Sequence, residues 1–344
     1  MGAILVVNAG STSLKLHLVL PDESVRAVES LDAVLSSDVE AVGHRVVHGG
    51  RYLVDPTVID DAVRASVGEL RSIAPLHNAP ALAGIDAASQ IFPGVPHVAV
   101  FDTAFHATIP AEAATYALPQ TWREEWGIRR YGFHGLSVQW CSERAADLLG
   151  HQDLRLVVCH LGGGCSVTAV CNGRSVDTTM GFSPLEGVPM ATRSGSVDPG
   201  AILFVQRVHG LSVDDVDRAL NEQSGLHGLS VERDLRALEA ADDESAQLAL
   251  GVYTYRIAGA VAAMTAALGG LDALVFTAGV GEHSARVRAD VCNRLEFLGV
   301  QLDPELNARA TPDADVATPD SVARVLVIAA REELVVARAV RVLL

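Results

Sequence analysis

Short apolar runs recur along the chain, separated by polar, glycine-containing segments and by longer stretches with a helical pattern. Seven apolar runs predict strands, over residues 4–7, 14–20, 97–101, 154–159, 166–171, 273–277 and 322–329. Helices are predicted over 137–149 with Gly150 as the terminating residue, over 247–268, from near Ser284, and over 332–343. Strands that alternate with helices in this way are typical of an α/β protein.

Two stretches of the chain share one design. ILVVNAGSTSLKLHLV at 4–19 and LVVCHLGGGCSVTAV at 156–170 each consist of an apolar strand, a turn of small residues and a second strand. The two stretches have few identical residues, so the likeness lies in the pattern. A unit that occurs twice indicates two domains of the same design that face each other.

Length and charge narrow the classes of function. The sequence has 344 residues, which suits two domains or one large one. It has 26 lysines and arginines against 42 aspartates and glutamates, a formal net charge of −16. Such a charge repels nucleic-acid backbones and anionic lipid headgroups. We therefore expect no nucleic-acid partner and no membrane partner, and any bound phosphate must be held by a local site.

Cysteine usage and the apolar segments favour a cytoplasmic protein. The five cysteines form no CxxC pair and are odd in number, which argues against a disulfide framework and a zinc site. The N-terminal run MGAILVVNAG lacks the basic region and cleavage motif of a signal peptide and predicts a strand. The apolar stretch 257–271 is shorter than the roughly 20 residues that a membrane span needs and predicts a buried helix.

Three turns rich in small residues follow predicted strands. The first, at 8–13, precedes Lys15 and is either a phosphate-binding turn or a polar hairpin. In the second, at 160–166, three successive glycines indicate close approach by a ligand or by another stretch of backbone. The third, at 277–284, either places a nucleotide at the N-terminus of the next helix or is a plain strand-to-helix turn.

Four single residues are candidates for chemistry. Arg45 and Arg193 lie in glycine-containing segments, where an arginine either recognises an oxyanion or forms a surface ion pair. Asp102 follows the predicted strand 97–101, at the edge where α/β proteins bind ligands. His134 lies among small and aromatic residues, where a histidine is either catalytic or structural.

Taken together, these segments resemble the acetate kinase family. Ten segments match in the family's order and span nearly the whole chain: VVNAGSTSLK at 6–15, GHRVVHGG at 43–50, PLHN at 75–78, VFDTAFH at 100–106, YGFHG at 131–135, HLGGGCS at 160–166, MGFSPLEGVPMATRSGSVDPG at 180–200, DLR at 234–236, FTAGVGEHS at 276–284 and REEL at 331–334. Ten ordered matches are far more specific than any one turn.

The resemblance implies an actin-like ATPase fold of the ribonuclease H-like type, with two similar α/β domains and an active-site cleft between them. The first domain is expected over 1–150, shortened between 20 and 43 and completed by a C-terminal helix at 332–344. The second, a nucleotide-binding domain, is expected over 151–331. The resemblance also implies a homodimer.

The resemblance further implies the reversible transfer of the γ-phosphoryl group of ATP to acetate, which gives ADP and acetyl phosphate, with Mg²⁺ or Mn²⁺. Carboxylic acids have a pKa of about 4, so acetate is already ionised near neutral pH and needs no strong base. The difficulty is to bring this anion to a polyanion and to stabilise the charge on the transferring phosphoryl group.

Matched residue by residue, the family's motifs assign a role to each candidate position. The catalytic positions are Arg45, Asp102, His134 and Arg193. The substrate positions are Arg45, Val47, Leu76, Phe133 and Pro184. The phosphate loop has Asn8, Ser11 and Ser13, and the metal positions are Asn8 and Glu332. The nucleotide positions are Lys15, His160, Leu161, Gly162, Gly163, Gly164, Asp234, Leu235, Arg236, Gly279, Val280, Gly281, Glu282 and His283. Because the substrate is ionised, we interpret Asp102 as orienting the metal or its water rather than as a base.

Three departures from the family's pattern leave alternatives. The family commonly has asparagine where this chain has Gly163 and His283, and the stretch between 20 and 43 is shorter than usual. The alternatives are a propionate kinase, an acetate kinase that uses pyrophosphate in place of ATP, and a non-catalytic nucleotide-binding protein of the same superfamily. The joint presence of the four catalytic positions favours a kinase over the last of these.

Overall fold

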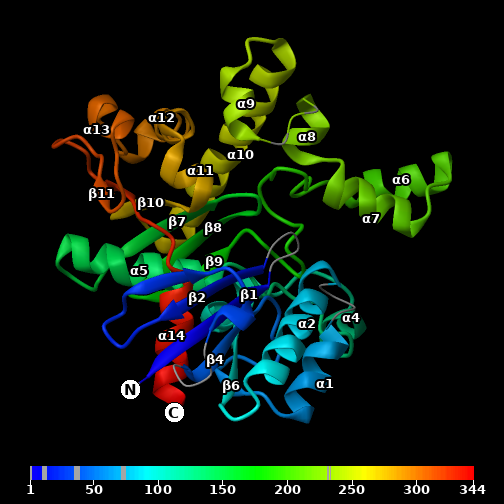
Figure 1. The fold of residues 1–344 in the computed structure, drawn as a ribbon. Coiled ribbons are helices and arrows are strands. Elements are labelled where there is room, and N and C mark those ends of the chain that lie inside the picture. The colour runs from blue at the N-terminus through cyan, green and yellow to red at the C-terminus, as the bar shows by residue number, and fades with distance from the viewer. Residues whose placement is uncertain (1, 10–13, 35–38, 71–74, 231, 233) are drawn as a thin grey trace.

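Two sheets organise the chain, and helices cover them (Figure 1). The structure, a computed structural model, describes residues 2–9, 14–34, 39–70, 75–230, 232 and 234–344. Each sheet has six strands. Both the N-terminus and the C-terminus lie on the side of the first sheet (Figure 1).

The first sheet has the strand order β3-β2-β1-β4-β6-β5. Its strands are β1 Ala3–Ala9, β2 Leu14–Val19, β3 Val25–Val28, β4 Val39–Val46, β5 Thr57–Val58 and β6 His97–Phe101. β1, β4 and β6 run parallel, whereas β2, β3 and β5 pair antiparallel with their neighbours. The carboxyl ends of the three parallel strands therefore meet at one edge of the sheet.

The second sheet repeats this arrangement in the order β9-β8-β7-β10-β12-β11. Its strands are β7 Arg155–Leu161, β8 Cys165–Cys171, β9 Arg174–Thr178, β10 Ala273–Thr277, β11 Ala314–Asp315 and β12 Arg324–Val327. β7, β10 and β12 run parallel, and β8, β9 and β11 pair antiparallel. The same order and the same strand directions in both sheets confirm the predicted α/β fold with two similar units.

Helices occupy both faces of each sheet. They are α1 Asp61–Glu69, α2 Pro75–Ile91, α3 Ala111–Ala114, α4 Gln120–Glu124, α5 Gly135–Leu149, α6 Pro199–His209, α7 Val213–Glu222, α8 Gly225–Ser230, α9 Leu235–Ala240, α10 Glu244–Leu268, α11 Ala278–His283, α12 Ala285–Asn293, α13 Pro304–Ala308 and α14 Glu332–Leu343. Among the described residues, short 3₁₀ helices span Leu31–Ala33, Ala104–Thr108 and Glu296–Leu298. In the first sheet α2 packs on one face, and in the second sheet α10 does so.

The opposite faces of the two sheets are covered by α14 and α5, which also contact each other. α14 packs its apolar side against β1 and β4 of the first sheet, far from it in sequence (Figure 1). The close approach depends on Gly43 in β4, because a Cβ there would lie 2.6 Å from Val336 and 2.9 Å from Val340. α5 packs on β7 and β10 of the second sheet. The predicted domain boundary at residue 150 stays a prediction.

Most predicted elements are found close to their predicted bounds. The strands at 97–101 and 273–277 and the helix at 332–343 have the predicted ends. The predicted strand at 322–329 is shorter, because only Arg324–Val327 pairs with its neighbours. The turn predicted at 277–284 is wrong for residues 278–283, since these form α11, whereas the helix predicted from near Ser284 is confirmed, because Ser284 caps α12.

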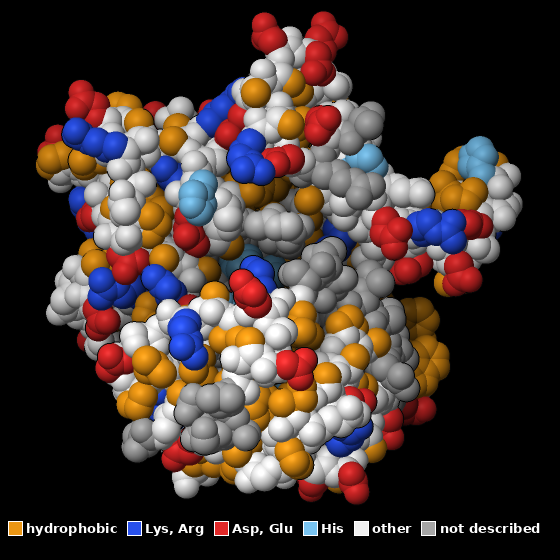
Figure 2. Space-filling view, viewed as in Figure 1, with side chains coloured by type: hydrophobic (Ala, Val, Ile, Leu, Met, Phe, Trp, Pro, Cys, Tyr) orange, Lys and Arg blue, Asp and Glu red, His pale blue; other side chains and the backbone are white. Residues whose placement is uncertain are grey.

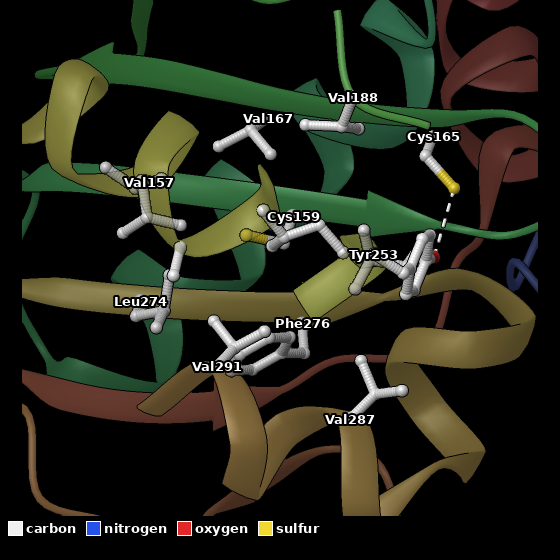
Figure 3. Close-up of a cluster of buried hydrophobic side chains, with 14 of the residues drawn as sticks. Val157, Cys159, Cys165, Val167, Val188, Tyr253, Leu274, Phe276, Val287 and Val291 are labelled. Carbon is white, nitrogen blue, oxygen red and sulfur yellow. Dashed lines mark hydrogen bonds between the residues drawn. The ribbon is translucent and has the colours of Figure 1, made fainter. Parts of the chain in front are cut away.

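α10 is the predicted buried helix. Within the described part of the chain it is the one helix long and apolar enough to cross a membrane by length and composition. Tyr253, Ile257 and Val261 lie on its buried side and belong to the core of the second sheet. Figure 3 shows how Tyr253 points into this core beside Cys159 and Phe276. The packing confirms the prediction of a core helix.

Candidate active site

A cleft of about 620 Å³ lies between the two sheets. Figure 2 shows a hollow between the two halves of the molecule, with charged side chains at its mouth. The cleft is lined by Asn8, Lys15, His17, Arg45, Val47, Asp102, Phe133, His134, His160, Gly162, Gly163, Gly164, Pro184, Arg193, Ala278, Gly279, Glu282, Ala330, Glu332 and Glu333. All four predicted catalytic residues are among them, so segments far apart in sequence converge on one cavity.

Arg45 is at the centre of the half of the cleft that the first sheet supplies. It lies near the end of β4, in register with Asn8 of the parallel strand β1. Its Nε donates to Oδ1 of Asp102 at 2.9 Å, its Nη2 donates to Oδ2, and its Nη1 donates to Oδ1 of Asn8 at 3.0 Å. Nε also lies 3.6 Å from Oε2 of Glu332. Burial opposes the charged guanidinium, but these two carboxylates raise the pKa of Arg45, so it stays cationic.

Asp102 is fully buried, and both of its carboxylate oxygens accept hydrogen bonds from Arg45. Burial raises the pKa of Asp102 to about 6, against the attraction of Arg45. Its backbone carbonyl accepts from the N–H of Gly135 at 2.9 Å, and a Cβ at Gly135 would overlap this carbonyl oxygen. The start of α5 therefore packs directly on Asp102 and keeps it in place.

Glu332 closes this cluster from the first turn of α14. Nδ2 of Asn8 donates to its Oε2 at 3.2 Å. Burial alone would raise the pKa of Glu332, but Arg45, His160 and Lys15 lower it below the ordinary value. Glu332 therefore carries a full negative charge in the cleft.

The donor atoms here suit a hard cation that arrives with phosphates. Among the described residues no group of three or more histidine, cysteine or acidic side chains could hold a metal on its own. Mg²⁺ is usually bound by one or two carboxylates together with substrate phosphates rather than by an all-protein cage. Glu332 offers a carboxylate on the cleft wall, and the Asn8 amide oxygen, which accepts one hydrogen bond from Arg45, has a second lone pair, so the residues fit such an ion.

Two stacked histidines form the floor between the sheets. The rings of His134 and His160 lie 4.0 Å apart between centroids, with 18° between their planes. Nδ1 of His134 is 3.1 Å from Oγ of Ser166, and Nδ1 of His160 is 2.8 Å from Oγ of Ser137. Burial, helped by the neighbouring ring, lowers the pKa of His134 well below its ordinary value, and burial lowers that of His160 to about 4. Both imidazoles are therefore neutral at physiological pH.

Arg193 and His134 both lie beside the glycine turn between β7 and β8. A Cβ at Gly164 would lie 3.0 Å from Nη2 of Arg193 and 3.2 Å from Nε2 of His134. A side chain here would make both groups shift by a few tenths of an ångström. Nη1 of Arg193 donates to the carbonyl of Pro184 at 2.7 Å, which fixes the guanidinium beside the turn.

The same turn is anchored from the core of the second sheet. Sγ of Cys165 lies 3.3 Å from the carbonyl of Gly162, to which it donates. Sγ also lies 3.2 Å from Oη of Tyr253 on α10 (Figure 3). Burial raises the pKa of Cys165, so the thiol keeps its proton. The position of the turn is thus tied to a fully buried residue of α10.

The apolar wall of the cleft consists of Val47, Phe133 and Pro184. Val47 and Phe133 are buried, and both belong to the hydrophobic cluster of the second sheet. The fourth predicted pocket residue, Leu76, lies in α2, and its side chain is outside the described part of the structure. These residues and Arg45 line the same cleft.

Several predicted nucleotide positions do not line the described cleft. Leu161 and Leu235 are buried in the core, and Gly281 packs against the backbone of Phe276. The Asp234 and Arg236 side chains pair with each other at 2.6 Å on the surface. Val280 packs against the core, and Nδ1 of His283 bonds to the carbonyl of Gly279 at 2.9 Å. Ser11 and Ser13 lie outside the described residues. The roles of these residues stay predictions.

Four lining residues were not predicted from the sequence: His17, Ala278, Ala330 and Glu333. His17 is two residues after Lys15 in β2, and strand alternation places both on one face, so the pattern contained a signal for it. Ala330 is held by Glu282, whose Oε1 accepts from its N–H at 2.9 Å. Its place in the cleft results from tertiary packing, which no local pattern shows.

Residues 25–338 match the Acetokinase family. The chain belongs to this family. The acetate kinase of Nostoc punctiforme is 48% identical over 349 residues, which cover 98% of this chain and 84% of the relative. The acetate kinase of Methanosarcina acetivorans is 46% identical over 336 residues, which cover 95% of this chain and 82% of the relative. As a family member, the chain is a phosphotransferase that uses a carboxyl group as acceptor.

Solved structures of family members have the same fold. A propionate kinase from Francisella tularensis superposes with a TM-score of 0.91 at 35% identity, covering 98% of this chain and 99% of that chain. An acetate kinase from Porphyromonas gingivalis superposes with a TM-score of 0.89 at 34% identity, covering 100% of both chains. The predicted resemblance is thereby confirmed over nearly the whole chain.

Proposed function

We propose that the protein is an acetate kinase, which reversibly transfers the γ-phosphoryl group of ATP to acetate. The observation that carries the proposal is the convergence of Arg45, His134 and Arg193 on one cleft beside the glycine turn. Phosphoryl transfer depends on positioning and on neutralising charge, and these residues supply cations and hydrogen-bond donors for both tasks.

Arg45 binds the acetate carboxylate and the phosphoryl group that moves toward it. Its charge offsets the repulsion between the two anions. Asp102 holds the guanidinium by both oxygens, so we assign it the positioning of Arg45 in place of the predicted contact with the metal. Since the carboxyl group of the substrate is already ionised at neutral pH, no proton has to be removed before attack.

Arg193 and His134 stabilise the charge on the phosphoryl group during in-line transfer. Arg193 contributes a guanidinium that is fixed by the Pro184 carbonyl. His134 acts as a neutral donor: when Nδ1 accepts from the Ser166 hydroxyl, Nε2 carries the proton and faces the glycine turn. Donors that are already oriented in a site shielded from water stabilise developing charge with little reorganisation.

Asn8 and Glu332 would hold Mg²⁺, or Mn²⁺ in its place, which supplies positive charge to the phosphates of the nucleotide. Lys15 also lines the cleft, and its charge helps to lower the pKa of Glu332. The nucleotide phosphates lie along Gly162, Gly163 and Gly164, whose lack of side chains lets the backbone approach them. Gly279, at the start of α11, also lines the cleft.

The acid substrate is chosen by Val47, Phe133 and Pro184. A pocket of this kind separates acids that differ by one methylene by only about 1–3 kcal/mol. We therefore propose acetate as the best substrate and propionate as a slower one. The donor is ATP, and pyrophosphate is the second candidate, because Gly163 and His283 replace residues on the nucleotide side.

One assay separates these functions from nucleotide binding without catalysis. Hydroxylamine traps an acyl phosphate as a hydroxamate while the acid and the donor are varied. We expect the most hydroxamate with acetate and ATP, and less with propionate. Higher activity with pyrophosphate than with ATP would overturn the assignment of ATP as the donor. If no pair of acid and donor gives a hydroxamate, only nucleotide binding without catalysis remains as the function.

We further propose that the protein is a cytoplasmic homodimer. The five cysteines are free, which suits a reducing compartment. α6 and α7 project from the rest of the molecule, and apolar side chains are visible on this arm (Figure 2). Leu203, Phe204 and Val208 of α6 are 47, 54 and 61% exposed. A second copy of the chain would cover them, and light scattering of the wild type and of a Phe204→Ser variant tests this.

A further inference from the structure

The loop between β9 and α6 carries Pro184 to the cleft, and it is held from behind by Arg130. Nη1 of Arg130 donates to the carbonyls of Thr178, Thr179 and Met180 at 2.8, 3.0 and 3.2 Å. Nη2 of Arg130 donates to Oε1 of Glu186 at 3.1 Å. One guanidinium thus joins the start of the loop to a residue beyond Pro184.

Tyr116 makes the second half of this contact. Its Oη donates to Oε2 of Glu186 and accepts from the N–H of Phe182 at 3.0 Å. Burial raises the pKa of Tyr116, and the Glu186 carboxylate raises it further, so the hydroxyl stays protonated. The Arg130 guanidinium lies over the Tyr116 ring at 5.6 Å. Both oxygens of Glu186 are therefore engaged, one by each partner.

Gly181 shows how closely these groups pack. A Cβ at this position would overlap Oε2 of Glu186 and Oη of Tyr116. Only a residue without a side chain leaves room for their hydrogen bond. The loop is thus fixed at residues 178–182 on one side of Pro184 and at Glu186 on the other.

Pro184 is the residue through which this fixed loop contacts the cleft. Pro184 lines the cleft, and its carbonyl accepts from Nη1 of Arg193 at 2.7 Å. The described lining of the cleft does not include Tyr116, Arg130 or Glu186. Because these three residues lie outside that lining, any effect they have on the reaction acts through Pro184 and Arg193.

We propose that Tyr116, Arg130 and Glu186 form a clamp that sets the width of the acid pocket and the direction of the Arg193 guanidinium, and thereby determines the choice of acid. The proposal rests on the proposed function. The three are positioning residues. When the clamp loosens, Pro184 withdraws, the space for a methyl group widens and Arg193 loses its fixed acceptor.

The test compares Tyr116→Phe and Glu186→Gln with the wild type and with Tyr131→Phe. Tyr131 is a matched control, because its Oη also donates a hydrogen bond, to the Gly127 carbonyl at 2.9 Å, outside the clamp. Phenylalanine at 116 removes the bond to Glu186 and the acceptor for Phe182. Glutamine at 186 keeps one acceptor oxygen and loses the other. Values of kcat and KM are measured with acetate, propionate and ATP, together with the melting temperature.

For both clamp variants we expect kcat/KM for acetate to fall roughly ten- to a hundredfold, because small displacements of reacting groups lower the rate by such factors. The fall with propionate should be smaller, so the preference for acetate narrows, while KM for ATP stays within about twofold. Tyr131→Phe should keep the wild-type preference. Combining the two clamp substitutions should cost little more than the worse single one, since they break one unit.

Folded variants with the wild-type preference for acetate and the wild-type KM would overturn the clamp, whatever their melting temperatures. If glutamine at 186 prevents folding, Arg130→Lys keeps the charge, loses the fork and must narrow the preference in the same way. A wild type that forms no acyl phosphate with any acid would instead contradict the proposed function.

Discussion

Asp102 grips Arg45 through both carboxylate oxygens, with Nε and Oδ1 2.9 Å apart, although the two residues are 57 positions apart in the sequence. The pairing follows from the sheet, because Arg45 lies near the end of β4 and Asp102 directly after the neighbouring parallel strand β6. An arginine held by two parallel bonds points in a fixed direction. This makes the pair the basis for orienting the acid.

Asp102→Asn should therefore impair the use of acetate more than the binding of ATP. Asparagine offers one acceptor oxygen in place of two, and the Arg45 guanidinium would turn. We expect kcat/KM for acetate to fall about a hundredfold while KM for ATP changes by less than about threefold. The matched control is Asp272→Asn, which breaks a pair with Arg155 outside the cleft and should keep its activity. Equal losses for acetate and ATP would argue against a role in orienting Arg45.

His134 should behave as a neutral hydrogen-bond donor. His134→Ala should lower kcat by roughly 10²–10³-fold with little change in KM, because the contact strengthens in the transition state. His134→Gln, which keeps an N–H, should retain more activity. The pKa of His134 lies well below its ordinary value, so kcat should show no inflection from it between pH 6 and 8. A kcat that rises as His134 becomes protonated in that range would contradict the neutral form.

The contacts of Cys165 that anchor the glycine turn should affect the binding of ATP. Cys165→Ala removes the bond to Gly162 and the contact with Tyr253, so we expect KM for ATP to rise about three- to tenfold with KM for acetate unchanged. Cys165→Ser should restore most of the affinity, since a hydroxyl also donates. Cys292→Ala is the control, because Cys292 is a buried thiol of the same core. A similar KM for ATP in both alanine variants would show that the anchor plays no part.

Acid should unfold the protein through its buried histidines. Burial lowers the pKa of His44 to about 3 and those of His48, His106 and His160 to about 4, whereas an unfolded histidine titrates near 6.5. Below about pH 6.5 the unfolded chain binds more protons, so stability present at neutral pH is lost as the pH falls. Each of these four histidines lowers the free energy of unfolding by roughly 2 kcal/mol by pH 5, and the raised pKa of Asp102 offsets part of this loss.

Urea unfolding at pH 7 and pH 5 measures this loss as a drop in the free energy of unfolding. Measurements between pH 7.5 and 8.5 provide the control, because the histidines are neutral there in both states. A free energy of unfolding that is the same at pH 5 as at pH 7 would mean that these imidazoles are protonated in the folded protein.

Local sequence patterns predicted those elements whose structure is determined locally. The apolar run at 97–101 and the amphipathic segment at 332–343 have their predicted ends, and Gly150 ends α5 in the left-handed conformation with φ of 77°. α11 was missed because its glycines disfavour a helix by about 1 kcal/mol each. Its fold depends on tertiary packing, such as that of Gly281 on the backbone of Phe276.

Motifs named the site residues without showing what each side chain does. Spacing placed Asp102 at a ligand-binding edge, but only the sheet order shows that Arg45 takes both of its oxygens. The neutral state of His134 comes from burial beside His160, which no spacing reveals. Glu186 lay inside a matched segment, yet its contact with Tyr116 bridges 70 positions and depends on the folded loop.

The central claim is that cations held in this cleft join acetate to a phosphoryl group, and ³¹P NMR of the purified protein with acetate, ATP and Mg²⁺ tests it directly. The wild type should produce the resonance of acetyl phosphate together with ADP. An equally folded Arg45→Ala variant should produce neither above the background. A wild type that only hydrolyses ATP to inorganic phosphate, or an Arg45→Ala variant as active as the wild type, would contradict the account.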